Sequence, residues 1–152
     1  MPLTLRRAEA GDAAQVRDLT RAAYAPWATM LGREPLPMRA DYDRAVQEHR
    51  IDMAYDNDTL VGLIELVDEP EALLIENVAV RPDLQGGGIG TFLMRHAEAV
   101  ARAIGTPVLR LYTNGAFAVN IVLYQRLGYA ITREEQGPWG TVVHMRKPVP
   151  EQ

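Results

Sequence analysis

The chain has 152 residues, an apolar fraction of 47%, a charged fraction of 24% and a net charge of −4. This length suits one domain that buries roughly two-thirds of its unfolded surface, and the composition is that of a globular protein rather than a disordered one. It contains no Cys, which excludes a disulfide scaffold, a zinc finger and a thiol nucleophile, and the acidic balance disfavours a general nucleic-acid binder.

Residues 1–20 carry several charged side chains and no apolar core of a signal peptide. Nowhere does an uninterrupted apolar run reach the roughly 20 residues that a membrane-spanning helix needs. The lack of Cys suits a reducing compartment. Together these features predict a cytoplasmic protein with no membrane partner.

The N-terminal third is predicted to hold a strand, a helix, a loop and a second helix. Residues 3–7 are typical of a short strand, and Asp12 is the predicted N-cap of a helix with apolar residues at helical spacing. Residues 24–38 contain three prolines and a glycine among apolar side chains, which favours a packed loop. A short polar helix is expected over residues 41–50.

Three strands are predicted next. Residues 51–55 alternate with period two, residues 56–58 are turn formers and residues 60–67 return, a pattern typical of a hairpin. Residues 72–80 form a longer and more apolar run, which we expect at the centre of the sheet.

The C-terminal half is predicted to alternate helix and strand and to finish with two strands. These elements are a helix that ends at Gly105, a strand over 108–112, a helix over 116–127, and strands over 129–134 and 141–147. The order of elements predicts an α/β fold, with a mixed central sheet of about seven strands and helices on both faces. We expect residues 1–152 to form a single domain.

The segment Gln85–Gly90 places four glycines between an apolar strand and an amphipathic helix. Glycine lets the backbone turn tightly and leaves its amides accessible to a ligand. Amides at a helix N-terminus point outward, and the helix dipole favours an anion there. The segment therefore predicts a phosphate or pyrophosphate site, the alternative being a flexible surface turn.

The residues at defined spacings from the glycines distinguish between the possible phosphate-containing ligands. A P-loop needs a lysine at the start of the helix, and Ile89-Gly90-Thr91-Phe92 contains none. A dinucleotide fingerprint would place its third glycine at Thr91, and an acidic residue at the end of the next strand, where the chain has Arg110-Leu111-Tyr112. Both nucleotide interpretations fail on these residues.

The stretch Val78-Ala-Val-Arg-Pro-Asp-Leu-Gln-Gly-Gly-Gly-Ile-Gly90 resembles the signature of the GNAT N-acyltransferase superfamily, V-x-V-x-P followed by Q/R-x-x-G-x-G/A. Gln85, Gly88 and Gly90 match its fixed positions. The segment from Asn120 to Tyr129 resembles the L-Y-x-x-L-G-F/Y element of the same family. The order of elements also matches the family fold, so the resemblance covers nearly the whole chain and implies a single GNAT-like domain.

The resemblance implies an N-acetyltransferase that moves an acetyl group from acetyl-CoA to a primary amine by direct attack in a ternary complex, without a metal. The pantetheine arm of acetyl-CoA would lie on backbone groups of Val78, Ala79 and Val80, with the Val78 amide facing the thioester oxygen. The pyrophosphate would lie on the backbone of the glycine loop and helix start, formed by Gln85, Gly86, Gly87, Gly88, Ile89, Gly90 and Thr91.

Two side chains are candidates for proton transfer. Tyr124 stands where the family places the tyrosine that meets the CoA sulfur, which makes it the candidate general acid; alternatively it is a packed aromatic. Glu76 precedes Val78 by two residues and shares its side of the strand, which makes it the candidate base, directly or through water. Alternatively, Glu76 pairs with an arginine. Many family members have Asn where this chain has Phe117, and Asn120 would substitute, one turn before Tyr124.

The acceptor is either a small-molecule amine or a peptide N-terminus, and Tyr24, Trp27, Tyr42 and Trp139 are candidates for lining its pocket. The histidines show no metal-ligand spacing, and His96 is predicted to lie at the surface. A homodimer would be ordinary for this fold. The alternative function is a non-catalytic acyl-CoA-binding sensor or partner module.

Overall fold

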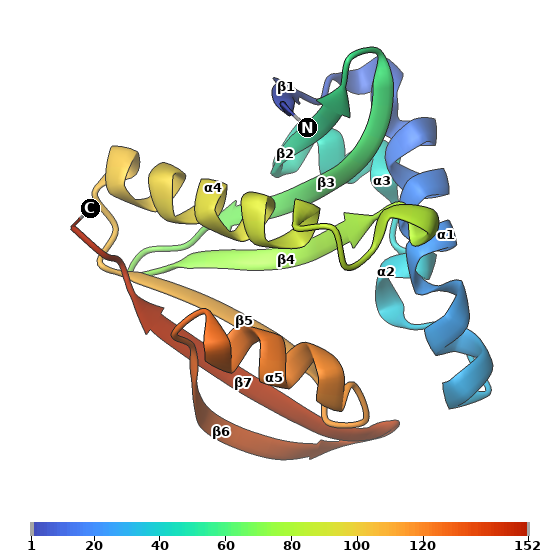
Figure 1. Ribbon diagram of the computed structural model, residues 1–152. Coiled ribbons are helices and arrows are strands. Elements are labelled where there is room, and N and C mark those ends of the chain that lie inside the picture. The colour runs from blue at the N-terminus through green and yellow to red at the C-terminus, as the bar shows by residue number, and fades with distance from the viewer. Residues whose placement is uncertain (1, 152) are drawn as a thin grey trace. The chain divides into compact units, whose positions relative to one another are not determined.

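The structure is a computed structural model that describes residues 2–151. Seven strands form one mixed sheet in the order β1-β2-β3-β4-β5-β7-β6 (Figure 1). This confirms the predicted α/β class, the mixed sheet and the order of elements along the chain. The elements are β1 (Thr4–Arg7), η1 (Ala10–Asp12), α1 (Ala13–Leu31), α2 (Leu36–Arg39), α3 (Tyr42–Glu48), β2 (Arg50–Asp56), β3 (Thr59–Asp68), β4 (Leu73–Val80), η2 (Pro82–Leu84), α4 (Ile89–Ile104), β5 (Val108–Asn114), α5 (Ala118–Arg126), β6 (Ala130–Gly137) and β7 (Gly140–Pro148).

The described chain forms two compact units. Unit 1 contains residues 2–67 and 77–96, and unit 2 contains residues 68–76 and 97–151. The boundary between Glu76 and Asn77 falls within β4, so each unit holds one part of this strand.

Unit 1 has helices on both faces of its strands. On one face, Val16 of α1 and Ala45 of α3 pack in one buried cluster with Met53 of β2 and Leu63 of β3. The neighbouring Gly62 points to the opposite face because successive strand residues alternate. A Cβ at Gly62 would lie 3.0 Å from Cγ2 of Ile89 and 3.2 Å from Cδ1 of Leu93, so α4 approaches β3 closely there.

In unit 2, β5 pairs antiparallel with β7, and β7 pairs antiparallel with β6 at the edge of the sheet. Period-two alternation buries one set of side chains and leaves the other more accessible. The buried set is Leu109, Leu111, Val143 and Met145, and the other set is Arg110, Tyr112, His144 and Arg146.

Helix α1 continues to Leu31 and α2 begins at Leu36, so the predicted loop over residues 24–38 is wrong except for residues 32–35. Pro26 lies inside the helix, where it removes its own backbone hydrogen bond without stopping the residues that follow. The helix ends instead at Gly32, which is left-handed at φ 72° and whose amide donates to the carbonyl of Ala28. A glycine rather than a proline therefore terminates α1.

Asp12 is the N-cap residue of α1 as predicted, but its side chain makes no capping hydrogen bond to that helix. Its carboxylate accepts instead from the amide of Glu9 at 2.8 Å and pairs with Arg6 at 2.9 Å. The polar helix α3 does have an aspartate cap, since the Asp41 carboxylate accepts from the amide of Arg44 at 3.2 Å.

Candidate active site

The glycine loop presents backbone amides at the start of α4. Gly86 and Gly88 have φ angles of +86° and +94°, which L side chains rarely adopt. The amide of Phe92 donates to the carbonyl of Gly88 at 2.9 Å. Because this is the first turn of α4, the amides of Ile89, Gly90 and Thr91 precede the helical ladder and point out of the helix end. Such an end attracts an anion.

The side chain of Gln85 closes this loop. Its Nε2 donates to the carbonyl of Val80 at 3.2 Å, which ties the loop to the last residue of β4. Val78 and Val80 are half-buried, whereas Ala79 between them is buried in the cluster with α1 and α3. The backbone of β4 is therefore anchored from one face directly before the loop.

Glu76 is held by a tyrosine on the neighbouring strand. The parallel pairing of β4 and β5 includes Leu73 opposite Leu109 and Leu74 opposite Arg110. Two residues further along each strand, the hydroxyl of Tyr112 donates to Oε1 of Glu76 at 3.0 Å. Arg110, which precedes Tyr112 by two residues on β5, forms a bidentate pair with Glu69 at 2.6 and 2.8 Å.

Helix α5 carries Asn120 and Tyr124 one turn apart on the same face. Both residues are half-buried, and the Tyr124 ring packs edge-on against Tyr129 at 6.3 Å between centroids. Burial raises the pKa of the Tyr124 phenol to about 12. Phe117, at the position where the family pattern has Asn, is a buried residue immediately before the helix.

Two side chains differ from their predicted environment. Tyr42 is only 3% exposed, and its hydroxyl donates to the carbonyl of Pro37 at 2.6 Å, so it is a core residue and not an exposed pocket wall. His96 is half-buried and lies 2.6 Å from Oδ2 of Asp52, so the predicted surface position is wrong. Trp139 at the β6–β7 turn is 53% exposed, and Tyr24 and Trp27 on α1 are half-buried.

The sequence model of the acetyltransferase (GNAT) family matches residues 14–129. This match spans the β4 strand, the glycine loop, α4 and α5. The chain belongs to the acetyltransferase (GNAT) family.

Two curated acetyltransferases are similar to this GNAT chain over part of its length. Mouse N-alpha-acetyltransferase 80 is 39% identical over 75 residues, which is 49% of this chain and 23% of the mouse protein. Streptothricin acetyltransferase of Streptomyces lavendulae is 42% identical over 60 residues, which is 40% of this chain and 32% of that enzyme. The matches thus cover less than a third of either relative.

The fold is similar to that of the PaiA N-acetyltransferase of Thermoplasma acidophilum, whose crystal structure contains coenzyme A. The TM-score is 0.83 over 97% of this chain and 99% of the other, at 19% sequence identity. This similarity shows that the chain has the fold of a GNAT acetyltransferase.

Two further observations concern residues 2–151 of this GNAT chain. No cluster of three or more His, Cys, Asp or Glu in this range could hold a metal ion. No helix there combines the length and apolarity needed to span a membrane.

Proposed function

We propose that this protein is an N-acetyltransferase that moves an acetyl group from acetyl-CoA to a primary amine by direct attack in a ternary complex. In this proposal residues 1–152 act as one catalytic domain in the cytoplasm. The observation that carries the proposal is the loop Gln85–Gly90 at the start of α4, within a chain of the GNAT family. The names of the similar proteins support N-acetylation in particular.

The glycine loop fits the pyrophosphate of acetyl-CoA, which supplies the thioester-bound acetyl group. A Cβ at Gly86 or Gly88 would meet nothing within 4 Å, so the loop backbone is accessible to a ligand. We assign the pyrophosphate to the amides of the loop and of the first turn of α4, where the helix dipole favours negative charge. Backbone groups of residues 78–80 hold the pantetheine arm, and the Val78 amide donates to the thioester oxygen.

In this proposal Tyr124 acts on the thioester sulfur of acetyl-CoA. A pKa of about 12 keeps its phenol protonated across the physiological range. An ordinary thiol has a pKa of about 8.5, so complete transfer of the phenol proton to a thiolate would be unfavourable. Tyr124 therefore donates a hydrogen bond and relays a proton, and the proton that ends on sulfur comes from the attacking amine.

Glu76 serves as the base. An alkyl ammonium has a pKa near ~10.4 and must lose a proton before it can attack. The Tyr112 hydroxyl donates to Oε1 of Glu76, which orients the carboxylate so that Oε2 accepts that proton directly or through a water. Asn120, on the Tyr124 face of α5, is assigned to the cofactor side of the site.

Thermal unfolding with acetyl-CoA, CoA, NAD and ATP in parallel tests the cofactor, and thiol release with a panel of amines tests the reaction. A ligand at a hundred times its dissociation constant stabilises the folded state by about 2.7 kcal/mol. We expect both CoA species to raise Tm and primary amines to release thiol. No shift with either CoA species would overturn the proposal. A shift without thiol release for any amine would identify a non-catalytic acyl-CoA-binding module.

A further inference from the structure

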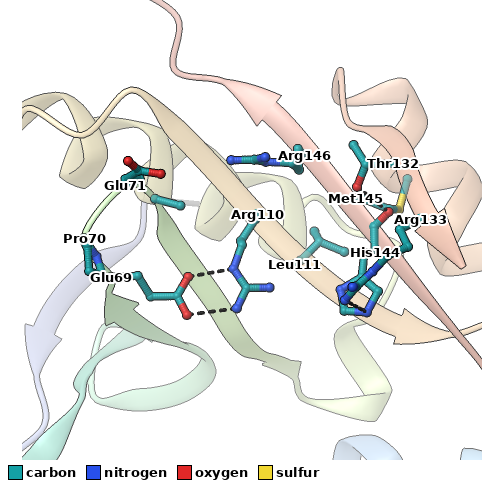
Figure 2. A pocket seen from close by; sticks show the side chains of 11 residues that line it. Glu69, Pro70, Glu71, Arg110, Leu111, Thr132, Arg133, His144, Met145 and Arg146 are labelled. Atoms are coloured by element: carbon teal, nitrogen blue, oxygen red, sulfur yellow. Dashed lines mark hydrogen bonds and ion pairs between the residues drawn. The ribbon is translucent and has the colours of Figure 1, made fainter. Parts of the chain in front are cut away.

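A pocket of about 660 Å³ opens in unit 2 beside β5, β7 and β6 (Figure 2). Three arginines line it from three different strands: Arg110 on β5, Arg133 on β6 and Arg146 on β7. Glu69 and Glu71, which precede β4, supply the carboxylates of the lining. The lining therefore carries more guanidinium groups than carboxylates.

Arg110 and Arg146 are direct partners in the β5–β7 ladder. Directly opposite residues have Cβ atoms about 5 Å apart, and like charges in this position destabilise a sheet. Both carboxylate oxygens of Glu69 bond to Arg110, and Figure 2 shows this closed fork with Arg146 extending from the neighbouring strand. Glu69 therefore already neutralises Arg110, and Arg146 is left as the charged member of the pair.

The third arginine is differently placed. Nη2 of Arg133 lies 3.5 Å from Oε1 of Glu135 and 3.2 Å from Nε2 of His144. Its positive charge is therefore partly balanced by Glu135. Arg146 is exposed and, of the three arginines, its charge is the one that is left for a ligand.

The candidate base lies one step along the same strands. Tyr112, which bonds to Glu76, follows Arg110 by two residues and shares its side of β5. His144 is the ladder partner of Tyr112 and precedes Arg146 by two residues, with the Tyr112 and His144 rings 6.0 Å apart. Two residues of a strand span about 7 Å. Glu76, Tyr112 and His144 thus form one row across the strands. Arg110 and Arg146 form the next row, two residues away along the strands.

We propose that this pocket binds a carboxylate of the acceptor, so that the acceptors are amines with a carboxylate remote from the nitrogen. This inference rests on the proposed acetyl transfer. The amine faces Glu76, and the carboxylate pairs with Arg146. Arg146 lies two strands from Glu76 in the sheet, which is about 10 Å across the strands and about 7 Å along them, and the long arginine side chain shortens this span. The acceptor is therefore an ω-amino acid, in which several bonds separate the amine from the carboxylate, and not an α-amino acid.

The test compares three acceptors of equal length: 6-aminohexanoate, hexylamine and hexane-1,6-diamine. Hydrogen bonds between charged groups are the strong ones, so we expect kcat/KM from thiol release to be at least about 10-fold higher for 6-aminohexanoate than for hexylamine, and lowest for the diamine. Arg146→Gln should remove the preference for 6-aminohexanoate without changing kcat/KM for hexylamine. Arg146→Glu should make kcat/KM highest for the diamine. Arg102→Gln, an exposed arginine on α4, is the matched control and should keep the wild-type preference.

Equal kcat/KM values for 6-aminohexanoate and hexylamine would overturn the carboxylate pocket, while the release of thiol would still support the transferase. An Arg146→Gln variant that lowers both values by the same factor would overturn the pocket as well. If no amine releases thiol, calorimetric titration of 6-aminohexanoate into the wild type and Arg146→Gln decides. If the wild type binds 6-aminohexanoate and Arg146→Gln does not, the pocket is supported although the reaction is not. If the wild type does not bind it, the pocket is overturned.

Discussion

The hydroxyl of Tyr112 donates a 3.0 Å hydrogen bond to Oε1 of Glu76, which joins β5 to β4 directly beyond their paired residues Leu74 and Arg110. A phenol that donates to one carboxylate oxygen fixes the orientation of the group without cancelling its charge. An arginine in the same place would neutralise the carboxylate. The tyrosine therefore suits a carboxylate that has to accept a proton.

We expect Glu76→Gln to lower kcat/KM by about 100-fold at neutral pH, because an amide cannot accept the amine proton. The dissociation constant for acetyl-CoA should not change. Tyr112→Phe removes only the orienting bond and should lower kcat/KM by less than about 10-fold. Steady-state kinetics over a range of pH checks both variants. A Glu76→Gln enzyme with the wild-type pH-rate profile would place the base elsewhere or in solvent.

Tyr124→Phe should lower kcat by about 10-fold or more while acetyl-CoA affinity stays within a few-fold. The phenol, with its pKa of about 12, is the active neutral form at all lower pH values. Its contribution is lost only as the pH rises through that value, so Tyr124 should cause no fall in wild-type activity below about pH 11. Pre-steady-state thiol release separates chemistry from product release. Turnover equal to the wild type in Tyr124→Phe would refute the relay.

Gly88→Ala should weaken CoA binding by about 10-fold. Gly88 has a φ of +94°, and an L residue in a left-handed conformation costs about 1–2 kcal/mol. The loop would relax and turn its amides away from the pyrophosphate. Calorimetric titration of CoA measures the effect, with Gly11→Ala as the control, since a Cβ at Gly11 meets nothing within 4 Å and lies outside the loop. Equal affinities for the two variants would exclude the loop as the binding element.

Asp52→Asn should lower the free energy of unfolding by about 2 kcal/mol at neutral pH, because it weakens the hydrogen bonds that a buried carboxylate accepts. Asp52 is 3% exposed and accepts from His96 at 2.6 Å and from Arg50 at 2.9 Å. Burial raises the pKa of the Asp52 carboxyl, but the bonds from His96 and Arg50 outweigh burial and hold that pKa below its usual value.

The lowered pKa of Asp52 determines how its contribution to stability depends on pH. A carboxyl with a lower pKa in the folded state stabilises the protein above its unfolded pKa of about 3.9, and the contribution is lost as the pH falls through the folded pKa. The difference between wild type and Asp52→Asn should therefore shrink below about pH 4. Urea denaturation at several pH values measures it, with Asp83→Asn as a control, since Asp83 is paired on the surface with Arg81. A difference that stays constant into acid would contradict the assignment.

Local sequence patterns predicted most of the elements because the relevant forces act over a few residues. The alternation in residues 51–55 and the turn formers at 56–58 predicted the β2–β3 hairpin, and the glycines of residues 86–90 predicted a loop that opens α4. Both patterns report backbone preferences, which neighbouring residues set. The same reasoning failed at Pro26, where a strong local helix breaker did not end α1.

The contacts that shape the site join residues far apart in the chain, and no local period encodes them. Strand β7 lies between β5 and β6 although it follows both in sequence, which places Arg146 opposite Arg110 and His144 opposite Tyr112. The bonds from Tyr112 to Glu76 and from His96 to Asp52 depend likewise on which strands and helices become neighbours. Strand order and register arise from burying the apolar faces of all elements at once, so these pairings became visible only in the folded chain.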